Sequence, residues 1–194
     1  MQRVYELRKQ ARENGHPILR DKSFELLIET IKRKTPKKIL EVGTNVGMSS
    51  LAMLLSSEDS TLTGIEIDES IAEEAKRNFA NFNLDSRAKI FVGDASEIIP
   101  ILTGGYDFIF LDGPKGHYYE YLTNLMPLLN KGGILFADNV LFNGYVWGRV
   151  KVPKKHNTIK NSMEKFLTAI TSDEKLKTTI YEIEDGVSIT EKLI

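Results

Sequence analysis

Cysteine is absent from the sequence, which excludes a disulfide framework and any metal site built on thiolates. No apolar run approaches the roughly 20 residues that a helix needs to cross a bilayer. The N-terminal segment Met1–Glu6 lacks the apolar core of a signal peptide. The net charge of −1 provides no overall attraction to nucleic acid or to anionic membranes. We therefore expect a soluble, cytoplasmic protein with no membrane partner.

The overall amino-acid composition is that of an ordinary globular protein. Hydrophobic residues make up 41% and charged residues 27% of the 194 residues, enough for one domain with a substantial core. Thr35-Pro36 ends an N-terminal helical part, because the residue before a proline is disfavoured in a helix. We expect a single domain over residues 1–194, with N-terminal helices in residues 1–35 and the core in residues 36–194.

Apolar strands and amphipathic helices alternate along the chain. The predicted helices span residues 3–13, 22–33, 47–57, 70–81, 95–102, 118–129 and 158–171. The predicted strands span residues 38–42, 61–67, 88–92, 106–111, 133–137, 177–183 and 187–191. This alternation predicts an α/β fold with a doubly wound, mostly parallel seven-stranded sheet. Glu184-Asp185-Gly186 carries an Asp-Gly turn signal, so the last two strands are expected to form an antiparallel hairpin.

Oxygen-bearing side chains follow two of the predicted strands. Asp112 comes directly after one apolar run with Lys115 three residues later, and Asp138 and Asn139 follow another. Short apolar runs bounded by turn residues are typical of buried parallel strands, whose carboxyl ends line the ligand crevice. Each residue taken singly is also a common turn or helix-capping residue. Together they predict an oxygen-only site that suits magnesium, manganese or calcium rather than zinc.

A glycine-rich loop, Glu41–Gly47, follows the first predicted strand and opens a helix. The loop has neither the three-glycine dinucleotide fingerprint nor the Gly-Lys-Ser/Thr of a phosphate-binding loop, so a pyrophosphate ligand is poorly supported. With Glu41 at its start, it suits a ligand that carries a cationic amino group and a nucleoside. Glu66, at the end of the second strand, is placed to bind ribose hydroxyls or is a solvated strand-end charge. Asp94 either binds an adenine amino group or caps the next helix.

These segments resemble a known family. The loop Glu41–Gly47, Glu66 and Gly93–Ala95 are similar to class I S-adenosylmethionine-dependent methyltransferases. Asp112–Lys115 and Asp138–Asn139 narrow the resemblance to metal-dependent O-methyltransferases of the catechol and caffeoyl-CoA type. The likeness runs from about residue 18 to the C-terminus. Within that family the sequence most resembles bacterial tRNA 5-hydroxyuridine methyltransferases, in segments Pro36–Glu41, Asp138–Phe142 and Asp185–Ile189.

The resemblance implies a role for each matching residue. It implies that Asp112, Asp138 and Asn139 hold the metal and that Lys115 is the catalytic base. The residues that it places at S-adenosylmethionine are Glu41, Gly43, Thr44, Gly47, Ser49, Glu66, Asp94, Ala95 and Asp112. Of these, Glu66 would hold the ribose, and Asp94 and Ala95 would hold the adenine. Met48 departs from the family pattern, which commonly has an aromatic residue at that position.

The expected reaction is methylation of a hydroxyl that has a second oxygen beside it. We expect 5-hydroxyuridine at the tRNA wobble position as the acceptor, because a basic stretch lies beside aromatic residues. The alternative is a solvated loop with its aromatics packed inward, and a small catechol, caffeoyl-CoA-like compound or other vicinal diol as acceptor. The cations are Arg149, Lys151, Lys154, Lys155 and Lys160, and the aromatics are Phe142, Tyr145 and Trp147.

Two rival classes of function are less well supported. A cofactor-binding scaffold without chemistry would not require Lys115 together with all three metal-ligand types. A nicotinamide dehydrogenase would require the missing glycine of the dinucleotide fingerprint. The scattered histidines His16, His117 and His156 do not indicate a zinc site. We also expect a homodimer.

Overall fold

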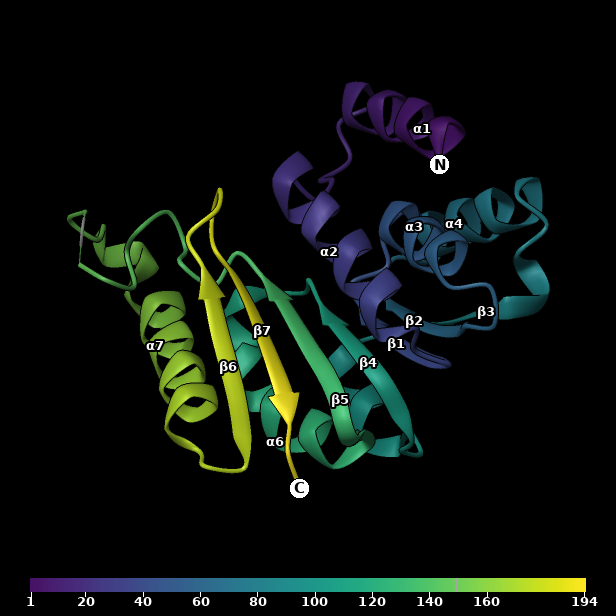
Figure 1. The fold of residues 1–194 in the computed structure, drawn as a ribbon. Coiled ribbons are helices and arrows are strands. Elements are labelled where there is room, and N and C mark those ends of the chain that lie inside the picture. The colour runs from purple at the N-terminus through teal and green to yellow at the C-terminus, as the bar shows by residue number, and fades with distance from the viewer. Residues whose placement is uncertain (149) are drawn as a thin grey trace. The chain divides into compact units, whose positions relative to one another are not determined.

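The structure is a computed structural model that describes residues 1–148 and 150–194. It contains two compact units, an N-terminal unit (Met1–Ile98) and a C-terminal unit (Ile99–Ile194), and each is described by itself. Figure 1 shows the succession of strands and helices in each unit. In the part of the chain that the structure describes, no helix is long and apolar enough to cross a membrane.

The N-terminal unit contains three parallel strands in the order β3-β2-β1. Lys38 of β1 lies opposite Thr61 of β2, and Leu62 of β2 lies opposite Ala88 of β3. Its elements are α1 (Gln2–Glu13), α2 (Asp21–Lys34), β1 (Lys38–Val42), α3 (Met48–Ser56), β2 (Thr61–Glu66), α4 (Glu69–Asn81), η1 (Asp85–Arg87), β3 (Ala88–Val92) and α5 (Ala95–Ile98).

Helix packing in this unit follows from the spacing of apolar residues. The buried side chains of α2 recur three or four residues apart, the period that places them on one helix face. In α4 the buried residues are Ala72, Ala75 and Phe79, again on one face. Gly47, which precedes α3, has a left-handed φ of 82°, and a Cβ there would lie 2.7 Å from the Phe79 ring. Glycine is therefore required where the glycine-rich loop meets α4.

The C-terminal unit contains four strands in the order β4-β5-β7-β6. β4 and β5 are parallel, and β7 is antiparallel to both of its neighbours. Its pairing with β6 is the hairpin that the Asp-Gly turn signal predicted. Its elements are η2 (Ile99–Ile101), β4 (Tyr106–Leu111), η3 (Lys115–His117), α6 (Tyr118–Leu128), β5 (Leu129–Asp138), η4 (Lys154–His156), α7 (Asn157–Ser172), β6 (Leu176–Tyr181) and β7 (Val187–Lys192).

Aromatic side chains fill the core of this unit. Phe110 of β4 and Phe136 of β5 meet edge to face, with 5.6 Å between ring centroids. Tyr118 of α6 and Phe166 of α7 meet in the same way at 5.5 Å, and all four side chains are buried. Such pairs add to the burial of apolar area. α6 and α7 pack on each other beside the strands (Figure 1).

The predicted fold class is confirmed: the sheet is seven-stranded and mostly parallel, and it ends in an antiparallel hairpin. Several predicted bounds were wrong. The helix predicted over residues 95–102 ends at Ile98 as α5, and the strand predicted over residues 133–137 spans Leu129–Asp138. Leu129 was expected to end a helix but begins β5, because it pairs with Tyr106 across the sheet. The helix expected from Ser70 begins at Glu69, since the Asp68 carboxylate accepts hydrogen bonds from the next helical N–H groups. The single domain over residues 1–194 stays a prediction.

Candidate functional site

Two acidic residues lie at the carboxyl ends of neighbouring parallel strands. Asp112 directly follows β4 and Asp138 is the last residue of β5, and Leu111 lies opposite Ala137 in the register. Both carboxyl groups therefore leave the sheet at the same edge. Asp138 is buried and Asp112 is half-buried. The structure thus brings together the two acids that the sequence predicted to converge.

The two carboxyl groups interact electrostatically. Burial and then the negative charge of Asp138 raise the pKa of Asp112 to about 8, while the nearby charge of Lys115 opposes the shift. A bound cation would reduce the repulsion between two such carboxylates. Carboxylate and amide oxygens are the ligands that hard divalent ions prefer, so the residues present fit magnesium, manganese or calcium.

The predicted donor set contains only two acids. Among residues 1–148 and 150–194, no group of three or more His, Cys, Asp or Glu side chains is arranged to hold a metal. The predicted set contains two carboxylates and the amide of Asn139, so it falls outside that kind of cluster. Asn139 follows Asp138 with a left-handed φ of 57°, which asparagine tolerates better than most residues. The metal assignment stays a prediction.

Tyr118 supports both acidic strand ends and was missed in the sequence. Its hydroxyl lies 3.2 Å from the carbonyl oxygens of Leu111 and Asp138, so it bonds the last residues of β4 and β5. Burial and then the charges of Asp112 and Asp138 raise the pKa of Tyr118, which keeps the hydroxyl protonated and able to donate. A tyrosine at the start of a helix carries no sequence signal for this role.

The loop after β5 is fixed by the turn between β6 and β7. Backbone N–H groups of Val140 and Leu141 donate to the carbonyls of Gly186 and Asp185, at 3.0 and 2.9 Å. The N–H of Asn143 donates to the buried Asp185 carboxylate. Gly186 has a φ of 83°, and a Cβ there would collide with the Leu141 side chain. The backbone that carries Asn139 is therefore held by contacts from the other end of this unit.

Lys115 begins the short helix η3, three residues beyond Asp112. It is half-buried, and its charge acts on the Asp112 carboxyl group. The Ser162 hydroxyl of α7 donates to the Gly116 carbonyl at 2.6 Å, which attaches η3 to α7. His117 is exposed and pairs with Glu120 at 2.8 Å in the first turn of α6. Lys115 is therefore a basic group close enough to Asp112 to interact with its carboxyl group.

The aromatic loop before η4 packs partly inward. Tyr145 stacks on His156, with 5.8 Å between ring centroids and 22° between planes, and the buried Phe142 meets both rings edge-on. Trp147 is 40% exposed. Lys151, Lys154 and Lys155 are exposed, whereas Lys160 is half-buried and pairs with Glu164 at 2.7 Å. Arg149 lies outside the described residues.

The glycine-rich loop of the N-terminal unit has two left-handed glycines, Gly43 (φ 91°) and Gly47 (φ 82°). Glu41 is buried in β1 and accepts a hydrogen bond from Ser50, and Ser49 is half-buried. Thr44 is also buried, and a side chain at Gly64 of β2 would collide with its hydroxyl. The cofactor roles of these residues stay predictions.

Glu66 is more than a strand-end charge. Its carboxylate accepts hydrogen bonds from the backbone N–H groups of Asn45 (2.7 Å) and Asp68 (3.0 Å), and the residue is 9% exposed. It thereby connects the glycine-rich loop to the start of α4. Each carboxylate oxygen has more than one acceptor position, so these bonds leave capacity for ribose hydroxyls. The neighbouring Ile67 is 69% exposed, an apolar surface that sequence reasoning missed.

Asp94 acts as a helix cap in the structure. Its carboxylate accepts hydrogen bonds from the backbone N–H and the hydroxyl of Ser96, both at 2.7 Å. The backbone N–H of Glu97 donates to the Asp94 carbonyl at 3.0 Å. Ala95 is buried at the start of α5. The capping alternative for Asp94 is thus observed, and its adenine contact stays a prediction.

A doubly wound sheet with a glycine-rich loop after β1 and an acid at the end of β2 has the organisation of class I methyltransferases. The sequence matches the O-methyltransferase family over residues 4–193. The chain therefore belongs to the O-methyltransferase family, and it is an S-adenosylmethionine-dependent O-methyltransferase.

Individual relatives agree with this assignment. A caffeoyl-CoA O-methyltransferase from Stellaria longipes is 28% identical over 181 residues, which cover 87% of this chain and 73% of that protein. A catechol O-methyltransferase from Niastella koreensis is 35% identical over 115 residues, or 57% of this chain and 52% of that protein. The solved structure of a provisionally named caffeoyl-CoA O-methyltransferase from Staphylococcus aureus is similar with a TM-score of 0.87 and 29% identity. That likeness covers 97% of this chain and 91% of the other.

Proposed function

We propose that this O-methyltransferase is divalent-metal-dependent and methylates a hydroxyl that has a second oxygen beside it. The observation that carries the proposal is the pair of carboxyl groups, Asp112 and Asp138, at adjacent parallel strand ends. Burial and then the charge of Asp138 raise the pKa of Asp112, and a bound cation would favour the ionised form of both carboxyl groups. Asp112, Asp138 and Asn139 would hold magnesium, manganese or calcium. When bound, the ion would lower the pKa of the acceptor hydroxyl and orient it.

Lys115 is the proposed base. A bound dication would destabilise the ammonium form of Lys115, and the neutral amine would then take the acceptor's hydroxyl proton on Nζ. The resulting oxyanion would attack the methyl carbon of S-adenosylmethionine. A carbon–oxygen bond forms while the carbon–sulfur bond breaks, and its electron pair stays on sulfur to give S-adenosylhomocysteine. The half-buried position of Lys115 beside Asp112 supports this role, because the base must lie close to the group it deprotonates.

The N-terminal unit supplies the proposed cofactor site. Glu66 binds the ribose, and its two backbone contacts hold the carboxylate at the end of β2 without using all of its acceptor positions. Asp94 and Ala95 bind the adenine, with Ile67 as an apolar surface for the base. The residues assigned to the loop side of the cofactor are Glu41, Gly43, Thr44, Gly47 and Ser49, and Asp112 is assigned to both ligands.

The proposed acceptor is 5-hydroxyuridine at the tRNA wobble position. Its hydroxyl and adjacent ring carbonyl are the two neighbouring oxygens that the metal mechanism requires. Exposed Lys151, Lys154 and Lys155 suit a phosphate backbone, and the partly exposed Trp147 suits an unstacked base. Phe142 and Tyr145 pack inward around His156, so they anchor the segment that carries these lysines and do not offer a surface for stacking a nucleobase.

The second candidate acceptor is a small catechol or a caffeoyl-CoA-like compound. The names of the Stellaria and Niastella relatives favour it. A catechol also presents two adjacent oxygens, and the same exposed lysines would suit the phosphates of a coenzyme A thioester. Both acceptors would therefore present two adjacent oxygens to the metal. They differ in what Lys151, Lys154 and Lys155 would bind, an RNA backbone or the phosphates of coenzyme A.

One set of assays tests the metal and the acceptor together. Purified protein is supplied with S-adenosylmethionine, magnesium and one of three acceptors: tRNA from cells that lack this protein, a catechol, or caffeoyl-CoA. Product nucleosides and small molecules are identified by mass spectrometry. We expect methylated 5-hydroxyuridine, with no turnover in excess chelator and recovery on addition of magnesium or manganese. Full activity in chelator would refute the metal mechanism, and turnover of catechol or caffeoyl-CoA alone would refute tRNA as the acceptor.

A further inference from the structure

Asn45 of the cofactor loop connects three segments of the N-terminal unit. Its backbone N–H donates to the Glu66 carboxylate at 2.7 Å, and its side-chain NH2 donates to the Pro17 carbonyl at 3.0 Å. Its side-chain carbonyl accepts the N–H of Val46 at 2.6 Å. The residue has a left-handed φ of 48°, a conformation that asparagine tolerates better than most other residues. Asn45 is therefore held by several contacts, one of which reaches the linker before α2.

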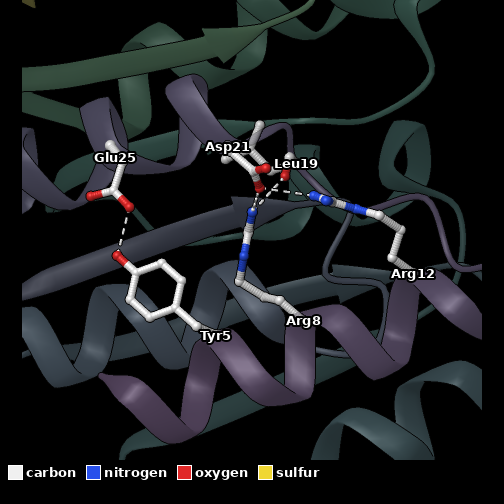
Figure 2. Close-up of polar contacts among 6 residues, drawn as sticks. All are labelled: Tyr5, Arg8, Arg12, Leu19, Asp21 and Glu25. Carbon is white, nitrogen blue, oxygen red and sulfur yellow. Dashed lines mark hydrogen bonds and ion pairs between the residues drawn. The ribbon is translucent and has the colours of Figure 1, made fainter.

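That linker, residues 14–20, joins α1 to α2 and is anchored by buried Arg8. The Arg8 guanidinium donates to the Leu19 carbonyl at 3.0 Å and pairs with Asp21 at 2.8 Å, as Figure 2 shows. It also lies 3.4 Å from the centroid of the Phe24 ring and is 3% exposed. Its burial lowers the pKa of Arg8, an effect that the bond to Asp21 opposes. A buried cation with these partners fixes the linker to α2.

Further contacts attach α1 to the helices on either side. In Figure 2 the Tyr5 hydroxyl donates to Glu25 at 2.6 Å, and Arg12 reaches Asp21 at 2.9 Å. At the other end of α1, Arg3 donates to the Asn81 carbonyl at the end of α4, at 3.0 Å. Because Glu66 accepts the N–H of Asp68 at the start of α4, the linker, the cofactor loop, Glu66 and α4 form a closed ring of contacts.

We infer that Asn45 is a positioning residue that couples the order of the N-terminal segment, residues 2–20, to cofactor binding at Glu66. This inference rests on the proposed cofactor site. A ligand that holds Glu66 and the loop favours the loop conformation in which the Asn45 side chain reaches the linker. The linker, in turn, holds the loop in the conformation that presents Glu66. Such coupling is reciprocal, so ordering of either segment strengthens the other.

The test compares two asparagine-to-glycine variants of the full chain. Asn45→Gly keeps the left-handed backbone and the N–H to Glu66 but removes both side-chain bonds. Asn83→Gly makes the same chemical change at an exposed asparagine with a φ of 57° and serves as the matched control. We expect Asn45→Gly to bind S-adenosylmethionine about 3- to 10-fold more weakly by calorimetry, the value of one or two neutral hydrogen bonds. Asn83→Gly should bind like the wild type.

Amide hydrogen exchange provides a readout that a merely structural role would not move. S-adenosylmethionine should protect residues 14–20 in the wild type and in Asn83→Gly. In Asn45→Gly it should still slow exchange in the loop, residues 43–47, but no longer in the linker. A lower melting temperature with unchanged ligand-induced protection of the linker would make Asn45 purely structural and overturn the inference.

A second variant approaches the coupling from the linker side. Arg8→Met removes the anchor at the Leu19 carbonyl, and the double variant with Asn45→Gly should bind about as weakly as Asn45→Gly alone, because both act through one segment. If the fold-losses of affinity in the two single variants multiply in the double variant, the coupling is overturned. Equal affinity of wild type and Asn45→Gly would overturn the inference while the cofactor site stands. A wild type that binds no S-adenosylmethionine would overturn the proposed cofactor site and the coupling with it.

Discussion

Stability of the metal-free protein should fall as the pH rises from 6 to 8. The pKa of Asp112 is about 8 in the folded protein against an ordinary value of 3.8, because burial and the charge of Asp138 disfavour ionisation. The unfolded chain has released this proton by pH 6, whereas the folded protein still holds it. Stability from this group is therefore complete at low pH and is lost as the pH rises toward the folded pKa. Between pH 6 and pH 8 the free energy of unfolding falls by about 1.4 kcal/mol per pH unit. The slope becomes shallower near pH 8, so the total loss is about 2 kcal/mol.

The assay is urea unfolding in chelator at pH 6 and pH 8, followed by circular dichroism. Asp112→Asn is the control, because it cannot ionise and should lose most of the pH dependence. Magnesium binds the ionised carboxylate, so it should stabilise the wild type more at pH 8 than at pH 6 and should stabilise Asp112→Asn little. Equal pH slopes in the wild type and the variant would refute the proximity of two ionisable acids.

Three other perturbations test separate parts of the site. Tyr118→Phe removes the donor to two strand-end carbonyls, so the free energy of unfolding in urea should fall by about 0.5–1.5 kcal/mol. Methyl transfer by this variant should also fall, whereas its affinity for S-adenosylmethionine, measured by calorimetry, should stay unchanged. Glu66→Ala should weaken S-adenosylmethionine binding about ten-fold or more, and an unchanged affinity would remove Glu66 from the cofactor site. Replacing the three exposed lysines by glutamine should flatten the salt dependence of tRNA binding by ~0.7 to 0.9 log units of slope per lost phosphate contact. The same variant should still methylate a catechol. Loss of catechol turnover with unchanged tRNA binding would contradict an RNA acceptor. The lysines are Lys151, Lys154 and Lys155.

The sequence predicts those features that depend on local pattern. Strands β1, β3 and β4 begin and end where their apolar residues indicate, because a short buried strand between turn residues has few alternatives. The proximity of Asp112 and Asp138 follows from the same pattern, since residues that end neighbouring parallel strands share a sheet edge. Both predictions required only the order of elements along the chain.

Features set by contacts between distant residues escaped prediction. Glu41 accepts a hydrogen bond from Ser50, because successive residues of a helix point about 100° apart and the start of α3 decides which one faces β1. Tyr118 supports two strand ends through a hydroxyl whose partners lie 7 and 20 residues away. Asn45 reaches the Pro17 carbonyl 28 residues earlier in the chain. No local pattern encodes such pairings.

The contacts between the loop after β5 and the turn at Asp185–Gly186 have a consequence for synthesis of the chain. The Asn143 N–H finds its carboxylate partner 42 residues later, and β5 acquires its antiparallel neighbour only when β7 is present. The segment that carries Asn139 therefore cannot be fixed on the ribosome until residues 185–192 have emerged. A nascent chain stalled in α7 would already contain the glycine-rich loop and both acids, but not the backbone support of the amide ligand. Premature termination there should yield chains that lack methyl transfer.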